Sequence, residues 1–382
     1  MALPELILAP FRLPVGQTTV LFAAVGALLT AWLTHLALRD CREPDRGWSL
    51  FAALAAAACC GLFAWCMLHF RVQDLPNVRP TEAWSYWRIG HHVFLISLML
   101  AVTATDLRAY LIPDRIPWYG LVWAVLLAGL SGDLQIEHVW VDWNQEIPQI
   151  QGPFMPAWLA LHPHWHGLAW SLAGATCGAL GTLIIRWLAS LALGQEAMGL
   201  GDVTLMAMIG AFLGWQPTLI VLILAPLCGL LITALLYFLR GLQTLVGAVI
   251  PRLKPTAAAR GFLPYGPFLC LAAYIVILTW RWIWMFEWRL TRTADSDDRI
   301  NTFAIRRLFG DWMALLLIAA VTLTALVVIL FLRRIYKNLP VQRLSAEPRD
   351  DVAKPPAADV PADDAAKPQA AVESEDSTMG EN

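Results

Sequence analysis

Long apolar segments separated by short polar connections constrain this chain more than any other feature. Of its 382 residues, 58% are hydrophobic and 15% are charged, and the mean hydropathy is +0.57. A helix needs about 20 mostly apolar residues to cross the ~30 Å hydrocarbon core of a bilayer. Recurrent runs of this kind predict an all-α, polytopic transmembrane helical bundle of about eight or nine helices. The expected spans are 17–38, 48–70, 91–106, 116–131, 168–191, 203–215, 217–239, 264–286 and 312–332, of which 203–215 has the weakest signal.

Composition argues against several other classes of protein. The formal net charge is −2 and no basic patch with interleaved aromatic residues occurs, so we expect no nucleic-acid partner. The seven cysteines include no Cys-x-x-Cys pair, which supports neither a zinc site nor a disulfide framework. The first apolar segment lacks a basic start and a small-residue cleavage site, so we expect a retained membrane helix.

The distribution of Lys and Arg predicts the orientation, because cytoplasmic loops are enriched in both. No Lys or Arg occurs between Arg115 and Arg186, and the intervening loop, 132–167, is acidic, so we expect this loop outside. Alternation then puts the N-terminus outside and the C-terminus in the cytoplasm. Residues 71–90 and 287–311 fit this orientation poorly, because they hold three and five arginines on the outer side.

Two aspartates lie where apolar runs begin or end. Asp106 closes the run 91–105, and Asp202 follows Gly199 and Gly201 at the start of another run. A carboxylate at the centre of a membrane helix costs about 2.5–3.5 kcal/mol, so such a residue indicates function. Both aspartates fall on the predicted cytoplasmic side, where they could act on one substrate bond. Two neighbouring carboxylates are the smallest set of groups with which an aspartic peptidase can act.

Three sequence elements around these aspartates resemble the signature of the type IV prepilin peptidases, which are membrane aspartic peptidases of the GxGD class. Residues 194–203, GQEAMGLGDV, are similar to the G-x-E-x-M-G-x-G-D element of that family. Residues 106–114, DLRAYLIPD, match D-L-x4-[LI]-P-D, and residues 263–268, LPYGPF, match I-P-[FY]-G-P-[FY]. Three elements in the right order are specific, and the resemblance covers roughly residues 17–286.

The resemblance implies an integral inner-membrane endopeptidase that cleaves the basic leader of type IV prepilins or pseudopilins at the cytoplasmic face. The motif positions of the catalytic pair are Asp106 and Asp202. We expect neither a cofactor nor a metal, because two neighbouring carboxylates that share one proton supply both an acid and a base. Either aspartate could hold that proton at rest.

The sequence departs from the family pattern in three places. Many members carry an insert with two Cys-x-x-Cys pairs, associated with zinc and N-methylation, where this chain has only Arg39–Gly47 with the solitary Cys41. N-methyltransferase activity is therefore left open. Thr204 replaces the usual Lys, and the last part of the chain extends beyond the family's usual end. The expected domains are 1–90 (N-terminal membrane helices), 91–286 (peptidase core), 287–339 (an extra C-terminal transmembrane helix) and 340–382 (a disordered acidic tail).

Other functions remain open at this stage. Membrane carboxylates also occur in proton-coupled transporters, although the boundary position of both aspartates and the lack of an inverted repeat argue against this class. A GxGD protease with a different membrane substrate and a catalytically inactive scaffold are further alternatives.

Several individual residues have a structural interpretation. Asp202 could cap a helix that begins at Val203, and Asp114 is expected to be a helix N-cap. We expect Glu196 to be solvated, and Pro264, Gly266 and Pro267 to shape a helix start. His162, His164 and His166 are expected in a solvated outer loop rather than in a metal site.

Overall fold

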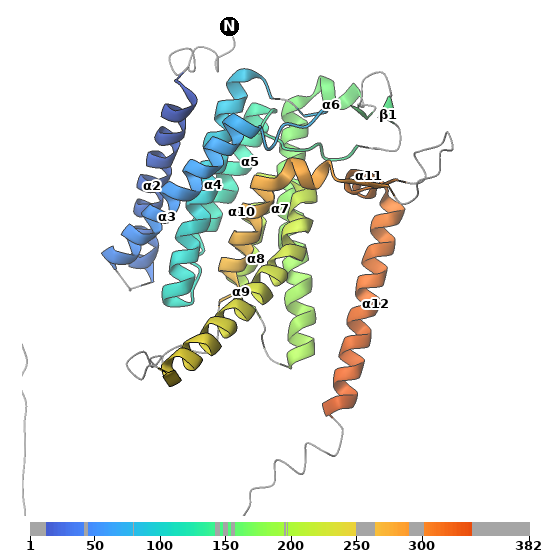
Figure 1. Ribbon diagram of the computed structural model, residues 1–382. Coiled ribbons are helices and arrows are strands. Elements are labelled where there is room, and N and C mark those ends of the chain that lie inside the picture. Colours follow the sequence, from blue (N-terminus) through green and yellow to red (C-terminus); the bar gives the residue numbers. More distant parts are fainter. Residues whose placement is uncertain are drawn as a thin grey trace, which may run out of the picture. The chain divides into compact units, whose positions relative to one another are not determined.

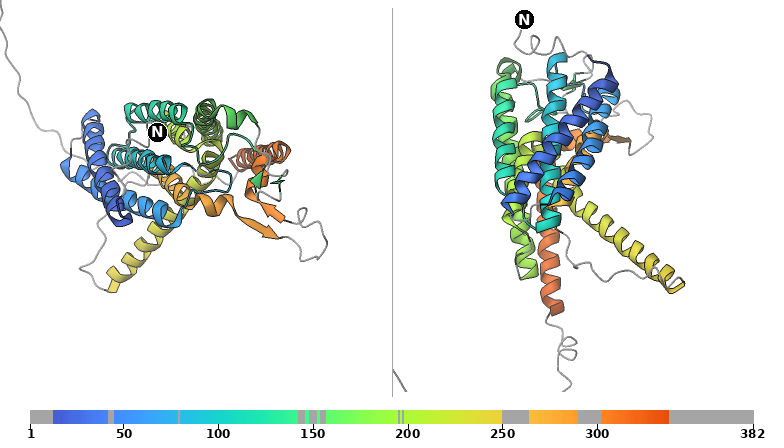
Figure 2. Two further views of the ribbon diagram at one scale, coloured as in Figure 1. Left: turned by 90° about the horizontal axis from the view of Figure 1, so that it is seen from above. Right: turned by 90° about the vertical axis from the view of Figure 1, so that its left-hand side faces the viewer.

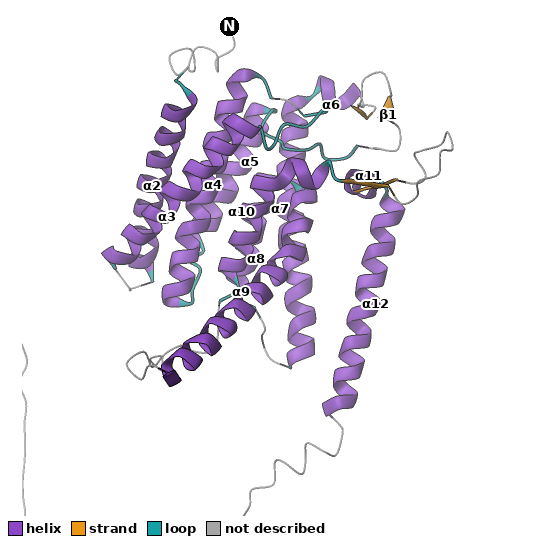
Figure 3. Cartoon of the chain, viewed as in Figure 1, coloured by secondary structure: helices purple, strands orange, loops and turns teal. Residues whose placement is uncertain are grey.

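The computed structural model confirms the all-α membrane fold (Figure 1, Figure 3). It describes residues 13–41, 45–78, 80–141, 146–147, 152–153, 157–194, 196, 198–249, 264–289 and 302–337. The chain divides into two compact units, Met1–Val328 and Ile329–Asn382. The predicted acidic tail, 340–382, lies outside the described residues.

Among the described residues, six helices are long and apolar enough to cross a membrane. They lie within α2 (Val15–Asp40), α3 (Arg46–Phe70), α4 (Glu82–Ala109), α7 (Pro163–Leu193), α9 (Trp215–Val249) and α10 (Gly266–Trp284). Shorter apolar segments form α5 (Arg115–Ser131), α8 (Leu200–Leu213) and the first part of α12 (Trp312–Lys337). Each predicted span coincides with one of these helices, so the chain is an integral, multi-pass membrane protein.

The remaining elements are short. Helix α6 is Ala157–Leu161, and α11 is Ile305–Gly310. Strand β1 (Glu146–Ile147) pairs with β2 (Gly152–Pro153), and β3 (Glu287–Arg289) pairs with β4 (Thr302–Ala304), both antiparallel.

Within the unit Met1–Val328, the helices enclose α8. Helix α7 packs against α5, α8 and α9, while α4 packs against α2, α3 and α10. The view from above in Figure 2 shows α4, α5 and α7 side by side. Nearly all of α8 from Asp202 to Leu213 is buried. Large apolar side chains such as Leu28, Phe51, Leu130 and Leu231 are exposed on the outer helices, as a lipid-facing surface requires.

Small residues allow α7 and α8 to approach closely. A β-carbon at Gly174 would collide with the carbonyl oxygen of Gly210, and one at Gly178 would collide with that of Met206. Glycines four residues apart on one face are a common way to bring membrane helices into backbone contact. This packing fixes α8 against a full-length transmembrane helix.

The connection 132–141 is held firmly at one end of the bundle. The Trp215 indole donates to the Val139 carbonyl at 2.6 Å, and the Trp280 indole donates to the Ile136 carbonyl at 3.2 Å. Glu137 is buried in the same connection, where its carboxyl accepts from the Asn77 side chain at 2.6 Å. Side chains of α9, α10 and residues 71–78 therefore anchor one segment.

Two helix starts differ from the predicted spans. Helix α4 begins at Glu82 instead of residue 91, because Arg88 is buried and donates to the Gln135 carbonyl at 2.8 Å. Helix α7 begins at Pro163 instead of residue 168. Polar residues that find partners inside the protein extend both helices beyond their apolar runs.

Candidate active site

Three helix ends meet at one end of the bundle, opposite the connection 132–141. Helix α4 runs toward this end, and α8 and α10 start from it (Figure 1). Asp106 lies in the last turn of α4 and is 6% exposed, and Asp202 lies in the first turn of α8 and is 7% exposed. The two carboxylates are near enough for their charges to interact. The structure thus brings the two predicted site residues together.

Asp202 is held by the backbone of its own helix start. Helix α8 begins at Leu200 with Gly199 as its N-cap, and the Asp202 carboxylate accepts a hydrogen bond from the Gly199 N–H. A side chain at the third helical position that reaches back to the N-cap N–H is one half of a capping box. The interpretation of Asp202 as the cap of a helix starting at Val203 is therefore wrong, because the helix starts three residues earlier.

Asp106 is held by the first residue of α10. Its carboxylate accepts a hydrogen bond from the Gly266 N–H, which is one of the donors that a helix start leaves without an intrahelical partner. A β-carbon at Gly266 would collide with the Asp106 carboxylate oxygen. The expectation that Pro264, Gly266 and Pro267 shape a helix start is confirmed by α10, but sequence reasoning missed the contact between Gly266 and Asp106.

Ile112 joins the three motifs. It lies in the connection after α4, where a β-carbon at Gly201 would come within 2.9 Å of the Ile112 Cβ. A β-carbon at Gly266 would come within 3.2 Å of the Ile112 Cδ1. The Ile112 side chain therefore packs against Gly201, which precedes Asp202, and against Gly266, which contacts Asp106.

Cys270 and Thr103 border the two carboxylates on the side toward the membrane interior. Thr103 lies one turn before Asp106 in α4, and its side chain forms a hydrogen bond with Cys270, one turn after Gly266 in α10. The Cys270 sulfur is within electrostatic reach of both aspartates.

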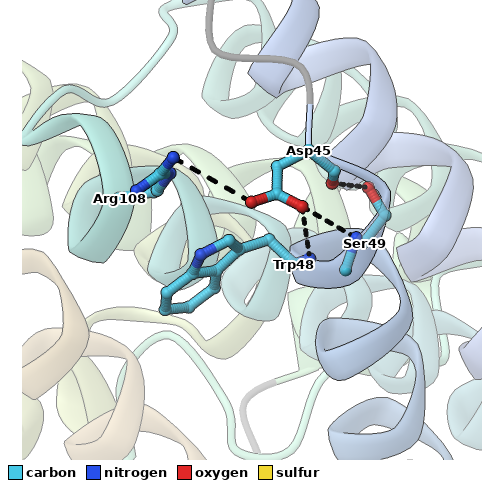
Figure 4. A network of polar contacts seen from close by, with 5 residues as sticks. Asp45, Trp48, Ser49 and Arg108 are labelled. Carbon is cyan, nitrogen blue, oxygen red and sulfur yellow. Dashed lines mark hydrogen bonds and ion pairs between the residues drawn. The ribbon is translucent and has the colours of Figure 1, made fainter.

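A polar network links the start of α3 to the end of α4, beside the site (Figure 4). Arg108 Nη2 lies 4.0 Å from Asp45 Oδ2. Asp45 Oδ1 caps α3 by accepting from the Gly47 N–H at 2.8 Å and the Trp48 N–H at 3.4 Å. A cavity of about 350 Å³ is lined by Asp45, Gly47, Trp48 and Phe51. Because both charged groups are partly exposed, this ion pair contributes little to stability.

The two other acidic residues of these motifs, Glu196 and Asp114, are exposed. The Glu196 side chain is 85% exposed and lies 3.3 Å from Arg186 Nη2, as its predicted solvated role requires. Asp114 occupies the N-cap position of α5 but makes no side-chain capping bond.

The prediction of a solvated loop holds for His162, which is exposed and precedes α7 as its N-cap, but not for the other two histidines. His164 is exposed but lies within α7, and His166 lies within α7 as well. His166 is buried, and its Nε2 accepts from the Val139 N–H at 3.2 Å. Across the described ranges, no cluster of His, Cys, Asp and Glu could hold a metal ion.

Comparison with known proteins gives a consistent set of relatives. Residues 93–234 match the type IV leader peptidase family. Relatives described as prepilin leader peptidase/N-methyltransferase include that of Pseudomonas putida, which is 33% identical over 125 residues (32% of this chain and 38% of the relative). That of Pseudomonas aeruginosa is 30% identical over 181 residues (45% and 56%), and that of Stutzerimonas stutzeri is 28% identical over 267 residues (66% and 74%). The matched region covers 38% of the Pseudomonas putida relative and 56% of the Pseudomonas aeruginosa relative, so the chain spans about half the length of these two proteins. No solved structure matches the chain significantly.

Proposed function

We infer that this chain is a membrane-embedded aspartic endopeptidase, because its residues 93–234 match the type IV leader peptidase family. We propose that it cleaves the basic leader of type IV prepilins or pseudopilins at the cytoplasmic face of the inner membrane. The observation that carries the proposal is the meeting of Asp106 and Asp202, both nearly buried, at one end of the bundle.

The proposed mechanism divides acid and base between the two carboxylates. The ionised carboxylate takes a proton from water as the water oxygen bonds to the scissile carbonyl carbon, while the protonated partner donates a hydrogen bond to the carbonyl oxygen. The C–N bond then breaks, and the leaving nitrogen takes a proton from the site. The backbone donors Gly199 and Gly266 hold the two side chains in place during these transfers.

The charge distribution supports a cytoplasmic position for the site. Arg39, Arg46, Arg108 and Arg115 lie at the helix ends near the aspartates. At the opposite end, Arg88 and Arg306 are buried, and Arg306 pairs with Glu287. Buried, paired arginines are not the loop charges on which orientation depends. This explains part of the poor fit of residues 71–90 and 287–311.

The position of the aspartates also argues against a proton-coupled transporter. In transporters, functional carboxylates lie near the bilayer midplane, commonly at interrupted helices. Here Asp106 lies in the last turn of α4 and Asp202 in the first turn of α8. The boundary position favours a substrate that reaches the site from one side of the membrane.

The decisive experiment incubates the purified protein in lipid nanodiscs with a candidate prepilin and measures the product masses. We expect cleavage by the wild type and a loss of about 100-fold or more in rate for Asp106→Asn and Asp202→Asn, because each removes an acid–base group. Glu196→Gln is the matched control, since it removes an exposed carboxylate of the same motif and should cleave normally. Wild-type rates in either Asn variant would overturn the mechanism.

The same spectrum tests methylation. Helix α2 ends at Asp40 and α3 begins at Arg46, so the connection is as short as the sequence predicts. We therefore propose processing without methylation and activity that survives zinc chelators. A product heavier by one methyl group, formed only with S-adenosylmethionine, would contradict this part of the proposal.

A further inference from the structure

An apolar groove adjoins the candidate active site. It lies between α4 and α10, with α3 along one side, and has a volume of about 160 Å³. Its lining includes Met99 and Thr103 of α4, Cys270 and Tyr274 of α10, and Cys59 of α3. The walls are almost entirely carbon and sulfur, in contrast to the carboxylates next to them.

The groove is lined by residues next to the candidate site on both α4 and α10, although neither aspartate itself lines it. Thr103 lies one turn before Asp106, and Pro267 directly follows Gly266, whose N–H donates to the Asp106 carboxylate. Cys270, which bonds to Thr103, is within electrostatic reach of both carboxylates. The lining continues for about two turns, or roughly 10 Å, along each helix. The groove and the site therefore share a wall.

Size and chemistry define what the groove can hold. A cavity of about 150 Å³ lined by apolar side chains stays dry and binds benzene, so this groove has room for one side chain of that size. A charged or strongly polar side chain would lose its hydration without gaining a partner. Leu100, Leu271 and Tyr274 are only partly buried along one side, which leaves an opening between the helices.

We propose that this groove is the subsite for one apolar side chain of the substrate, on the membrane side of the scissile bond. The inference rests on the proposed peptidase function. A substrate that enters from the bilayer would place its first apolar residue between α4 and α10 while the bond to be cut lies at Asp106 and Asp202. The volume of the groove then sets the preferred size of that residue.

The test changes the volume of the groove and measures selectivity. Met99→Ala enlarges it, and Cys59→Leu fills part of it. Substrates that differ only in Ala, Leu or Phe after the cleavage site are compared by kcat/KM in nanodiscs. We expect Met99→Ala to raise the ratio of kcat/KM for the Phe substrate to that for the Ala substrate by about 10-fold. Cys59→Leu should lower the same ratio by a similar factor, because one methylene group more or less in an apolar pocket changes selectivity by about this much. Met67→Ala, a buried methionine of α3 away from the groove, is the matched control and should leave the ratio unchanged.

The outcomes separate the subsite from the function on which it rests. A ratio is independent of how much enzyme folds, so a poorly folded variant still reports selectivity, and the two variants give independent tests. Cleavage by the wild type with unchanged ratios in both groove variants overturns the subsite alone. Equal changes for all three substrates indicate a lipid chain in the groove and also overturn it. Cleavage of none of the substrates by the wild type overturns the proposed function together with the subsite.

Discussion

Gly266 leaves no room for a side chain beside Asp106, so adding one methyl group at this position tests whether the contact positions the carboxylate. In Gly266→Ala, the new β-carbon must displace the Asp106 carboxylate or the start of α10. A displacement of about 1 Å at a reacting group can lower a rate by about 100-fold. We expect kcat to fall by about 10- to 100-fold with little change in KM or folding. Gly16→Ala is the control, because no atom lies within 4 Å of its added carbon. An unchanged kcat in Gly266→Ala would show that this contact does not position the carboxylate.

Glu137 predicts a pH-dependent stability at the opposite end of the bundle. Burial raises the pKa of this carboxyl from 4.5 to about 8, against the hydrogen bonds from the His138 N–H and Asn77. Between these values the folded state binds more protons than the unfolded state, so stability falls as pH rises. Burial lowers the pKa of His138 from 6.5, so this imidazole makes stability rise with pH, opposite in sign to Glu137, and a comparison with Glu137→Gln is what isolates the carboxyl.

Thermal denaturation in detergent measures this effect. The Tm of the wild type should decrease from pH 6.5 to 8, and Glu137→Gln should flatten that decrease, because the amide does not ionise. An identical slope in both proteins would assign the pH dependence to other groups.

The sequence was sufficient to predict that Asp106 and Asp202 lie near each other, because a carboxylate at the end of an apolar run is costly and therefore conspicuous. The sequence did not predict that Ile112 and Cys270 lie at the site, because nothing distinguishes one apolar side chain of a membrane protein from another until its neighbours are known. The burial of His166 was missed for a related reason, because the hydrogen bond from the Val139 N–H that holds this side chain inside is a tertiary contact.

At the scale of elements, the close approach of α7 and α8 is the contact most sensitive to side-chain volume. Leucine at position 178 would meet the backbone of α8 at Met206 and push the two helices apart. Overpacking of this kind costs about 1–3 kcal/mol. We expect Gly178→Leu to lower the Tm and the cleavage rate together, because α8 carries Asp202. Gly16→Leu, at an open position of α2, should change neither, and equal Tm values for the two variants would contradict the proposed packing.

The helices themselves were predictable because hydrocarbon length and hydropathy restrict a spanning segment so strongly. Their limits were less predictable. Helix α4 starts before the predicted residue 91 and runs through Arg88, which hydropathy treats as an interruption although its side chain is buried. Helix α8 had the weakest signal because it is short, and it is stable because α5, α7 and α9 surround it.

For the whole molecule, orientation is the property that the proposed function most requires. Leu161 is 72% exposed near the start of α7, and the Glu196 side chain is 85% exposed just beyond the end of the same helix. In a background without cysteines, we expect Leu161→Cys to react with an impermeant maleimide in intact cells. Glu196→Cys should react only after permeabilisation. The reverse pattern would place the aspartates on the outer face and remove the support for cleavage in the cytoplasm.

The length of α8 has a consequence for which proteins such an enzyme could attack. Its 14 residues span about 21 Å, less than the ~30 Å hydrocarbon core. Trp215, just past its far end, donates a hydrogen bond to the Val139 carbonyl, so we expect the missing length at the Asp202 end. The surrounding longer helices absorb this mismatch, so the lipid need not thin around it. We therefore expect the carboxylates below the level of the headgroups, so that depth limits which proteins can reach them. Under the proposed function, chains dissolved in the cytoplasm would not reach the site, and only a protein already anchored in the same bilayer would present a bond at that depth.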